Sequence, residues 1–136
     1  MDKFCSLLHR KLIEGGFTST IARDDFIVID YPYSKYPSIK HYFIRFHKNI
    51  VLVFTSVEIK SILLETYSKE DLAYALSEVA HIYKEDGVSL TIKDGALIVS
   101  SIIKTGFFTS ADSLYKKVYD NIIYCQSAFD AVMDLL

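Results

Sequence analysis

The chain contains few residues that break a fold or keep it flexible. Of its 136 residues, only two are proline and five are glycine, which argues against any long flexible linker. No internal repeat or low-complexity run is present. Apolar residues make up 51% of the chain and charged residues 24%, a balance that excludes an intrinsically disordered chain. We therefore expect residues 1–136 to form a single domain, because domains commonly contain about 100–150 residues.

Cysteine is equally scarce. Cys5 and Cys125 fall in predicted helices at opposite ends of the chain, and no CxxC motif is present. The pattern predicts two reduced, buried thiols of the kind found in cytosolic proteins. A disulfide that joins the two terminal helices is the alternative.

The chain also lacks a strong charge imbalance and a long apolar run. Its formal net charge is −2 and its pI about 6.0, whereas domains that grip phosphate backbones usually carry a basic excess. Nucleic acid is therefore not the expected partner. No stretch approaches the roughly 18 uncharged apolar residues of a membrane span, and His9, Arg10 and Lys11 interrupt the first apolar run, unlike a signal peptide. We expect a soluble, cytoplasmic protein that does not bind a membrane.

Catalytic motifs are missing as well. The sequence has no glycine-rich phosphate loop, no HExxH, no GxSxG and no nucleophile beside an obvious base. Glu58, Glu65 and Glu70 share no spacing that would set two carboxylates across a cleft. We expect no enzyme, metal or cofactor, although a catalytic site assembled from distant residues would leave no local motif.

The stretch HYFIRFHKN, residues 41–49, raises the question of a metal site. Side chains alternate between the two faces of a strand, so residues an even number apart share a face. One face then holds His41, Phe43, Arg45 and His47, and the core face holds Tyr42, Ile44 and Phe46. Six residues at about 3.3 Å each separate the two histidines by roughly 20 Å, too far for two ligands of one zinc ion. The first face is either exposed sheet surface or a binding surface.

The other segments of the first half follow from periodicity and breakers. A helix is predicted before Gly15–Gly16, and residues 17–31 form either one bent strand or a short hairpin. Residues 31–39, YPYSKYPSI, form a tyrosine-rich loop that could close off part of a sheet edge. A second strand, IVLVFTS, pairs with HYFIRFH through a two-residue turn. Residues 57–67 fit both periods, and a strand followed by a turn is favoured over a helix.

The second half has clearer signals. Ser68 and Asp71 fit the start of a capped helix that ends at Gly87, and Asp94–Gly95 is the turn of the hairpin VSLTIKDGALIVSSI. Thr109 or Ser110 then caps a final helix whose apolar stripe comprises Leu114, Val118, Ile122, Cys125, Phe129, Val132 and Leu136. At roughly 39 Å this helix either spans the sheet or overhangs it to meet a second copy. Additional apolar surface lies beside the stripe at Tyr115, Tyr119, Ile123 and Tyr124.

The predicted fold is α+β, with an antiparallel sheet of about five strands packed by helices in the order α-β-β-β-α-β-β-α. Segments over nearly the whole chain carry this order: LLHRKLIEGGF, DDFIVIDY, HYFIRFHK, IVLVFTS, SKEDLAYALSEVAHIYKEDG, VSLTIKDGALIVSS and the final helix. In this order and in size, the chain resembles the type III secretion chaperones and the YbjN-like proteins. The resemblance implies a small, cytosolic, often dimeric binding protein. Secretion chaperones hold an extended, partly unfolded stretch of an effector against hydrophobic patches, and YbjN-like proteins act in stress or regulation.

These observations favour a non-enzymatic protein-binding module, a chaperone or adaptor that holds a segment of a protein partner on a hydrophobic helix–sheet surface and is able to form a homodimer. The residues expected at the binding surface or dimer contact are Tyr42, Phe43, Phe54, Leu72, Leu76 and Tyr119. One alternative is an immunity-type protein that neutralises a toxin partner, because small acidic domains associate rapidly with basic partners. Another is a small-molecule-binding or enzymatic domain with an aromatic pocket. RNA binding on the His41, Arg45 and His47 face, with Phe43 stacking, fits the charge least.

Overall fold

A computed structural model describes residues 3–62, 68–106 and 110–136. Its helices are α1 (Lys3–Glu14), α2 (Ile59–Ile62), α3 (Lys69–Ile82) and α4 (Ala111–Leu135). Its strands are β1 (Ser19–Arg23), β2 (Phe26–Asp30), β3 (His41–His47), β4 (Ile50–Glu58), β5 (Val88–Lys93) and β6 (Ala96–Lys104).

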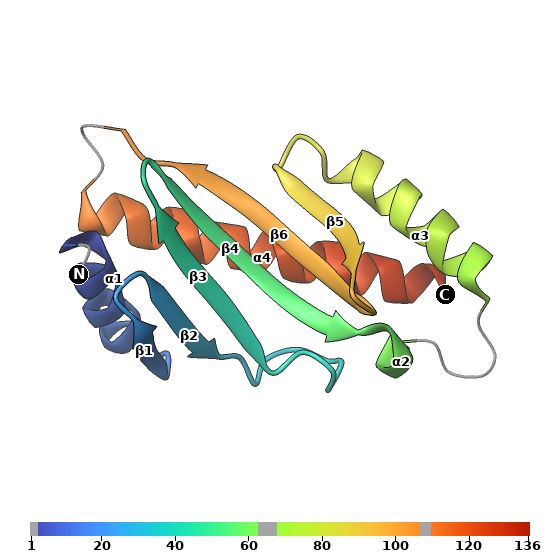
Figure 1. The fold of residues 1–136 in the computed structure, drawn as a ribbon, viewed down its shortest axis with the longest axis horizontal. Helices are drawn as coiled ribbons and strands as arrows, with labels where there is room; N and C mark the ends of the chain where they lie inside the picture. The colour runs from blue at the N-terminus through green and yellow to red at the C-terminus, as the bar shows by residue number, and fades with distance from the viewer. Residues whose placement is uncertain (1–2, 63–67, 107–109) are drawn as a thin grey trace.

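The described strands form one antiparallel sheet in the order β1-β2-β3-β4-β6-β5 (Figure 1). The predicted α+β class is confirmed, but the sheet has six strands rather than about five. The added strand arises because residues 17–31 form the β1–β2 hairpin and not one bent strand. The register of this hairpin shifts between Ile21 and Arg23. The predicted order of elements lacked this strand.

The ambiguous segment 57–67 divides between strand and helix. β4 continues the sheet through Glu58, and the short helix α2 begins at Ile59. Residues 63–67 of that prediction lie outside the described residues.

The two predicted hairpin turns are confirmed by their backbone geometry. Asp94 and Gly95 have φ angles of 52° and 76°, and Lys93 faces Ala96 across the turn. Positive φ at both central positions is the geometry of a type I′ turn, whose twist matches that of the flanking strands. His47 faces Ile50 across the other turn, where Lys48 has a φ of 52°.

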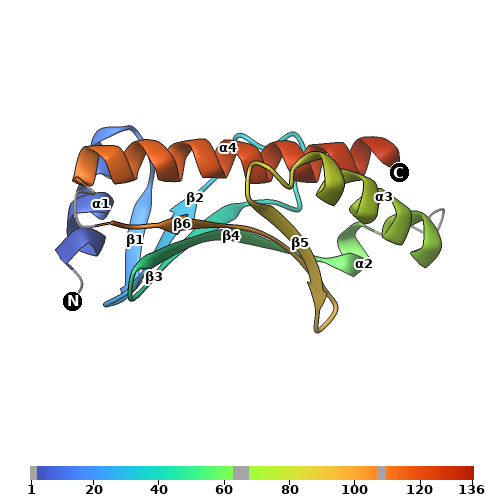
Figure 2. The same cartoon turned by 90° about the horizontal axis from the view of Figure 1, so that it is seen from above.

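The helices lie on one side of the sheet. α4 runs across the strands along the length of the molecule, while α1 and α3 lie toward its opposite ends (Figures 1 and 2). The predicted stripe faces the sheet, because six of its seven residues are buried and Leu136 is half-buried. Burying a large apolar side chain contributes roughly 1.5–3 kcal/mol, so the burial of this stripe stabilises the packing of the helix on the sheet.

Both cysteines are buried free thiols, as predicted. Cys5 lies on α1 and Cys125 on the buried stripe of α4. Burial raises the pKa of the Cys125 thiol to about 12, and the nearby Ser101 side chain only partly opposes this shift. The thiol therefore stays protonated and packs as a small apolar side chain.

No described helix covers the other side of the sheet. The β3–β4 and β5–β6 hairpins bend away from α4, so the uncovered side is concave (Figure 2). We call this surface the open face. In the described part of the chain, no helix is both long and apolar enough to cross a membrane.

Candidate functional site

The open face carries a strip of apolar side chains, in which Ser100 separates Ile98 from Ile102 along β6. Strand alternation sends the buried residues of β2, β3, β4 and β6 toward the helices and their less buried neighbours to the open face. The strand register places Phe43 between Val28 and Phe54, and Leu52 beside Ile102. The resulting apolar strip comprises Phe26, Val28, Phe43, Leu52, Phe54, Ile98 and Ile102.

Three phenylalanine rings form the centre of the apolar strip. The ring of Phe43 is stacked on that of Phe54, with centroids 5.2 Å apart, and on that of Phe26, with centroids 5.9 Å apart. The centroids of Phe26 and Phe54 are 6.4 Å apart, so the three rings form a triangular cluster. Ile102 is the most exposed member of the strip, with 56% of its surface accessible.

Cationic side chains gather at one end of the apolar strip, near the β1–β2 and β3–β4 turns. The basic end consists of Arg23, Arg45, Lys48 and Lys104, which are all exposed. Two carboxylates lie in the β1–β2 turn, Asp24 and Asp25, and Asp25 pairs only weakly with Arg45 at 4.0 Å. The basic end therefore keeps an excess of positive charge, although the net charge of the whole chain is negative. At the opposite end, Asp30 and His41 pair at 3.3 Å.

The structure distributes the six predicted site residues over four locations. Phe43 and Phe54 face each other on the open face. Tyr42 lies on the opposite side of β3, in the core, while Leu72 is buried and Leu76 half-buried on α3. Tyr119 is 44% exposed on α4.

Sequence reasoning missed most of the apolar strip. Its members Val28, Leu52, Ile98 and Ile102 come from strands whose pairing the sequence does not show. The available signal was the period of two within each strand, which indicates that alternate residues share a face but not which strands are neighbours.

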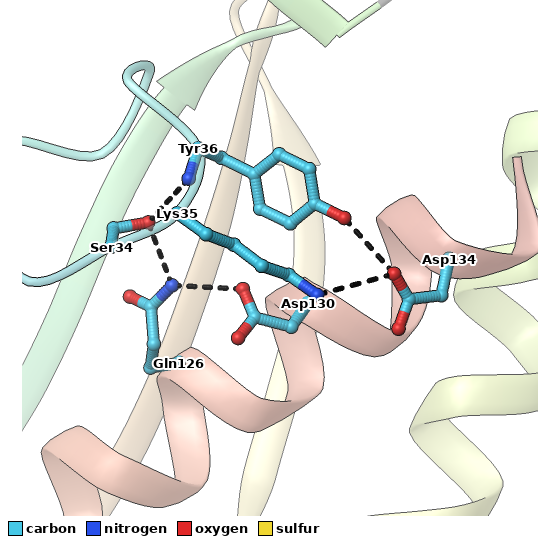
Figure 3. A network of polar contacts seen from close by, with 6 residues as sticks. All are labelled: Ser34, Lys35, Tyr36, Gln126, Asp130 and Asp134. Carbon is cyan, nitrogen blue, oxygen red and sulfur yellow. Dashed lines mark hydrogen bonds and ion pairs between the residues drawn. The ribbon is translucent and has the colours of Figure 1, made fainter.

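The tyrosine-rich loop, residues 31–39, is fastened to α4 by a polar network (Figure 3). The Gln126 amide nitrogen donates to Ser34 Oγ at 2.9 Å and to Asp130 Oδ1 at 3.0 Å. One turn further along α4, Asp134 accepts a hydrogen bond from the Tyr36 hydroxyl at 3.0 Å and lies 3.5 Å from Lys35 Nζ. These contacts hold the loop on the helix side of the sheet.

A second aromatic surface lies on the helix side. Phe17 packs edge-on against Tyr33 and Tyr119, with centroids 6.4 Å and 6.2 Å away. We call Phe17, Tyr33, Tyr119 and Ile123 the helix-side patch. Together with neighbouring residues they line a depression of about 350 Å³.

A further apolar cavity of about 650 Å³ lies between α3 and the β5–β6 turn. It is lined by Leu72, Ala73, Ile92 and Gly95, with Lys60 and Lys69 among its other walls. Among the described residues, no group of three or more histidine, cysteine, aspartate or glutamate side chains could hold a metal ion.

The fold and the open face define a class of protein: an α+β domain with helices on one side of an antiparallel sheet and a concave apolar surface on the other. The chain is similar to the crystal structure of YbjN from E. coli, described as a proposed transcription regulator, with a TM-score of 0.63 over 96% of this chain and 89% of that one. At 11% sequence identity the likeness shows the fold alone, and the predicted YbjN-like fold is confirmed. No family model matches the chain, and no curated protein matches its sequence.

Proposed function

We propose that this chain is a non-enzymatic protein-binding module, a chaperone or adaptor that holds a segment of a partner protein on its open face. The observation that carries the proposal is the apolar strip, which crosses four neighbouring strands and is covered by none of the described helices. Contiguous apolar surface of this kind marks interaction sites in soluble proteins. Covering it contributes roughly 25 cal/mol for each Å² of apolar area removed from water.

The resemblance to secretion chaperones supports the same role, because those proteins hold client segments on hydrophobic patches. The description of YbjN as a proposed transcription regulator agrees with regulation exercised through a protein partner. We propose the helix-side patch as the contact for a second copy of this chain, which leaves the open face available to the partner.

The test uses two isoleucines with similar exposure on different surfaces. Ile102 is 56% exposed on the apolar strip, whereas Ile82 is 63% exposed on α3. Peptides are selected from a random displayed library against the wild-type chain and then titrated against Ile102→Ser and Ile82→Ser. Because both residues are largely solvated, neither change should unfold the protein, and thermal melts check this expectation.

We expect the selected peptides to lose about tenfold or more in affinity with Ile102→Ser, as expected for an anchor side chain at a binding surface. Affinity for Ile82→Ser should match that of wild type. Selected peptides that bind both variants equally well, or the absence of any selected peptide, would contradict the proposal.

A further inference from the structure

We infer that the partner segment on the open face is an amphipathic helix that places acidic side chains at the basic end. This inference rests on the proposed function and specifies its partner.

The hydrogen bonding of the sheet favours a helix over an extended segment. β2, β3, β4 and β6, which carry the apolar strip, each have a neighbouring strand on both sides. Their backbone donors and acceptors are engaged within the sheet, so they cannot pair with an added strand. An extended segment lying on the face would leave its own backbone groups without protein partners. A helix satisfies these groups internally and presents only side chains.

The shape of the open face also suits a helix. Three steps between neighbouring strands, at about 4.8 Å each, give the apolar strip a length of roughly 14 Å. A helix of about ten residues rises 15 Å and presents apolar side chains at i, i+3, i+4 and i+7 along one side. The concave curvature of the sheet receives a cylinder better than a flat surface would (Figure 2).

The charge distribution predicts the polar residues of that helix. Arg45 and Lys104 flank Leu52 and Ile102 at the basic end, and the nearest carboxylate, that of Asp25, lies 4.0 Å from Arg45. Carboxylates on the partner would gain Coulomb energy there without displacing a close ion pair. The inferred helix therefore carries glutamate or aspartate beside the apolar stripe.

The geometry of the phenylalanines favours a protein over single-stranded nucleic acid. Bases bind proteins by stacking on free aromatic faces. The rings of Phe26, Phe43 and Phe54 pack against one another in a cluster, so each ring already has two aromatic neighbours. Apolar side chains can pack against the ring edges and against Leu52 and Ile102, which offer nothing for a base to stack on.

Three labelled peptides test the inference. The first is a helix of about four turns with leucine and phenylalanine at i, i+3, i+4 and i+7 and glutamates along one flank. The second has lysines in place of the glutamates, and the third is the glutamate peptide with two central prolines, which prevent a helix. Binding is followed by fluorescence anisotropy at low and high salt.

We expect the glutamate peptide to bind about tenfold more tightly than the lysine peptide at low salt, with the difference shrinking as salt screens the charges. The proline peptide should lose most of its affinity. The double variant R45E/K104E should reverse the preference, while R10E/K84E, which changes two exposed cationic residues outside the open face, should not.

The experiment distinguishes a wrong partner charge, a wrong partner conformation and a wrong proposed function. If the two helical peptides bind equally and both lose affinity with Ile102→Ser, the proposed function holds and the acidic partner is wrong. If the proline peptide binds as well as the glutamate peptide, the helix is wrong. Tighter binding of a mixed-sequence single-stranded oligonucleotide would overturn the inference in favour of nucleic acid. If no peptide binds and the library selection also fails, the proposed function itself is wrong.

Discussion

At the residue scale, Tyr42 shows how a buried polar group is accommodated in an apolar core. Its hydroxyl donates to the side-chain oxygen of Gln126 at 2.8 Å, and the Gln126 amide nitrogen donates in turn to Ser34 and Asp130. Desolvation raises the pKa of Tyr42 well above its usual value, so the hydroxyl remains a donor at any physiological pH. One hydrogen-bonded chain thus connects β3, α4 and the tyrosine-rich loop.

We expect Tyr42→Phe to lower the free energy of unfolding by about 1–2 kcal/mol, because the oxygen of the buried Gln126 loses its donor. Tyr36→Phe is the matched control. It also removes a hydroxyl hydrogen bond to α4, but water can replace that bond because it is exposed. Urea denaturation of both variants provides the measurement. Equal losses of unfolding free energy in the two variants would show that the buried hydrogen bond stabilises the fold no more than the exposed one.

The same residue shows what the sequence could and could not predict. Alternation along HYFIRFH assigned Tyr42, Ile44 and Phe46 to the core face, and all three are buried. The partner of Tyr42, Gln126, lies 84 positions away in the chain. It is a polar residue next to the apolar stripe of α4, and nothing in the sequence connects it to β3.

At the element scale, the β5–β6 hairpin depends on its turn. Gly95 has a φ of 76°, a conformation that L side chains rarely adopt, and no heavy atom lies within 4 Å of the position that a Cβ would occupy. Substitution there is therefore a test of backbone strain without a steric clash.

We expect Gly95→Ala to destabilise the protein by about 1–2 kcal/mol, the cost of placing a side chain in the left-handed region. Gly106→Ala is the control, because Gly106 likewise has open space around a Cβ but has no positive φ. Thermal unfolding of the two variants should separate them by several degrees. A Gly95→Ala variant as stable as Gly106→Ala would show that the turn tolerates the change.

Local signals located some elements well and others poorly. The Asp94–Gly95 dipeptide is a strong turn signal, and the apolar spacing of α4 is regular over many residues. Both predictions are confirmed. The sequence alone does not distinguish the β1–β2 hairpin from one bent strand, because Arg23, Asp24 and Asp25 suit either a turn or a polar stretch of strand. Phe43 and Phe54 could be predicted at a binding surface, but the whole apolar strip could not, because it depends on four strands becoming neighbours through a register that local periodicity does not fix.

At the scale of the whole molecule, the sheet separates two surfaces. The open face lies on one side, and the helix-side patch lies on the side of α4, so a partner and a second copy would not compete for the same surface. The exposed side of α4 beside Tyr119 carries Lys116 and Asp120. In an antiparallel pairing of two α4 helices about a two-fold axis, Lys116 of one copy can meet Asp120 of the other.

We expect the wild-type chain to be a homodimer in solution and Ile123→Glu to be a monomer, because a buried glutamate without a partner strongly destabilises an interface. Ile123 is 40% exposed, so the change should leave the fold intact. Tyr74→Glu, at a position 64% exposed on α3, is the control and should remain dimeric. Light scattering over a range of protein concentrations measures the mass of each.

A wild-type chain that stays monomeric at every concentration would contradict the prediction, as would a dimer that survives Ile123→Glu. Because the open face lies on the opposite side of the sheet, the monomeric variant should still bind the glutamate peptide with wild-type affinity.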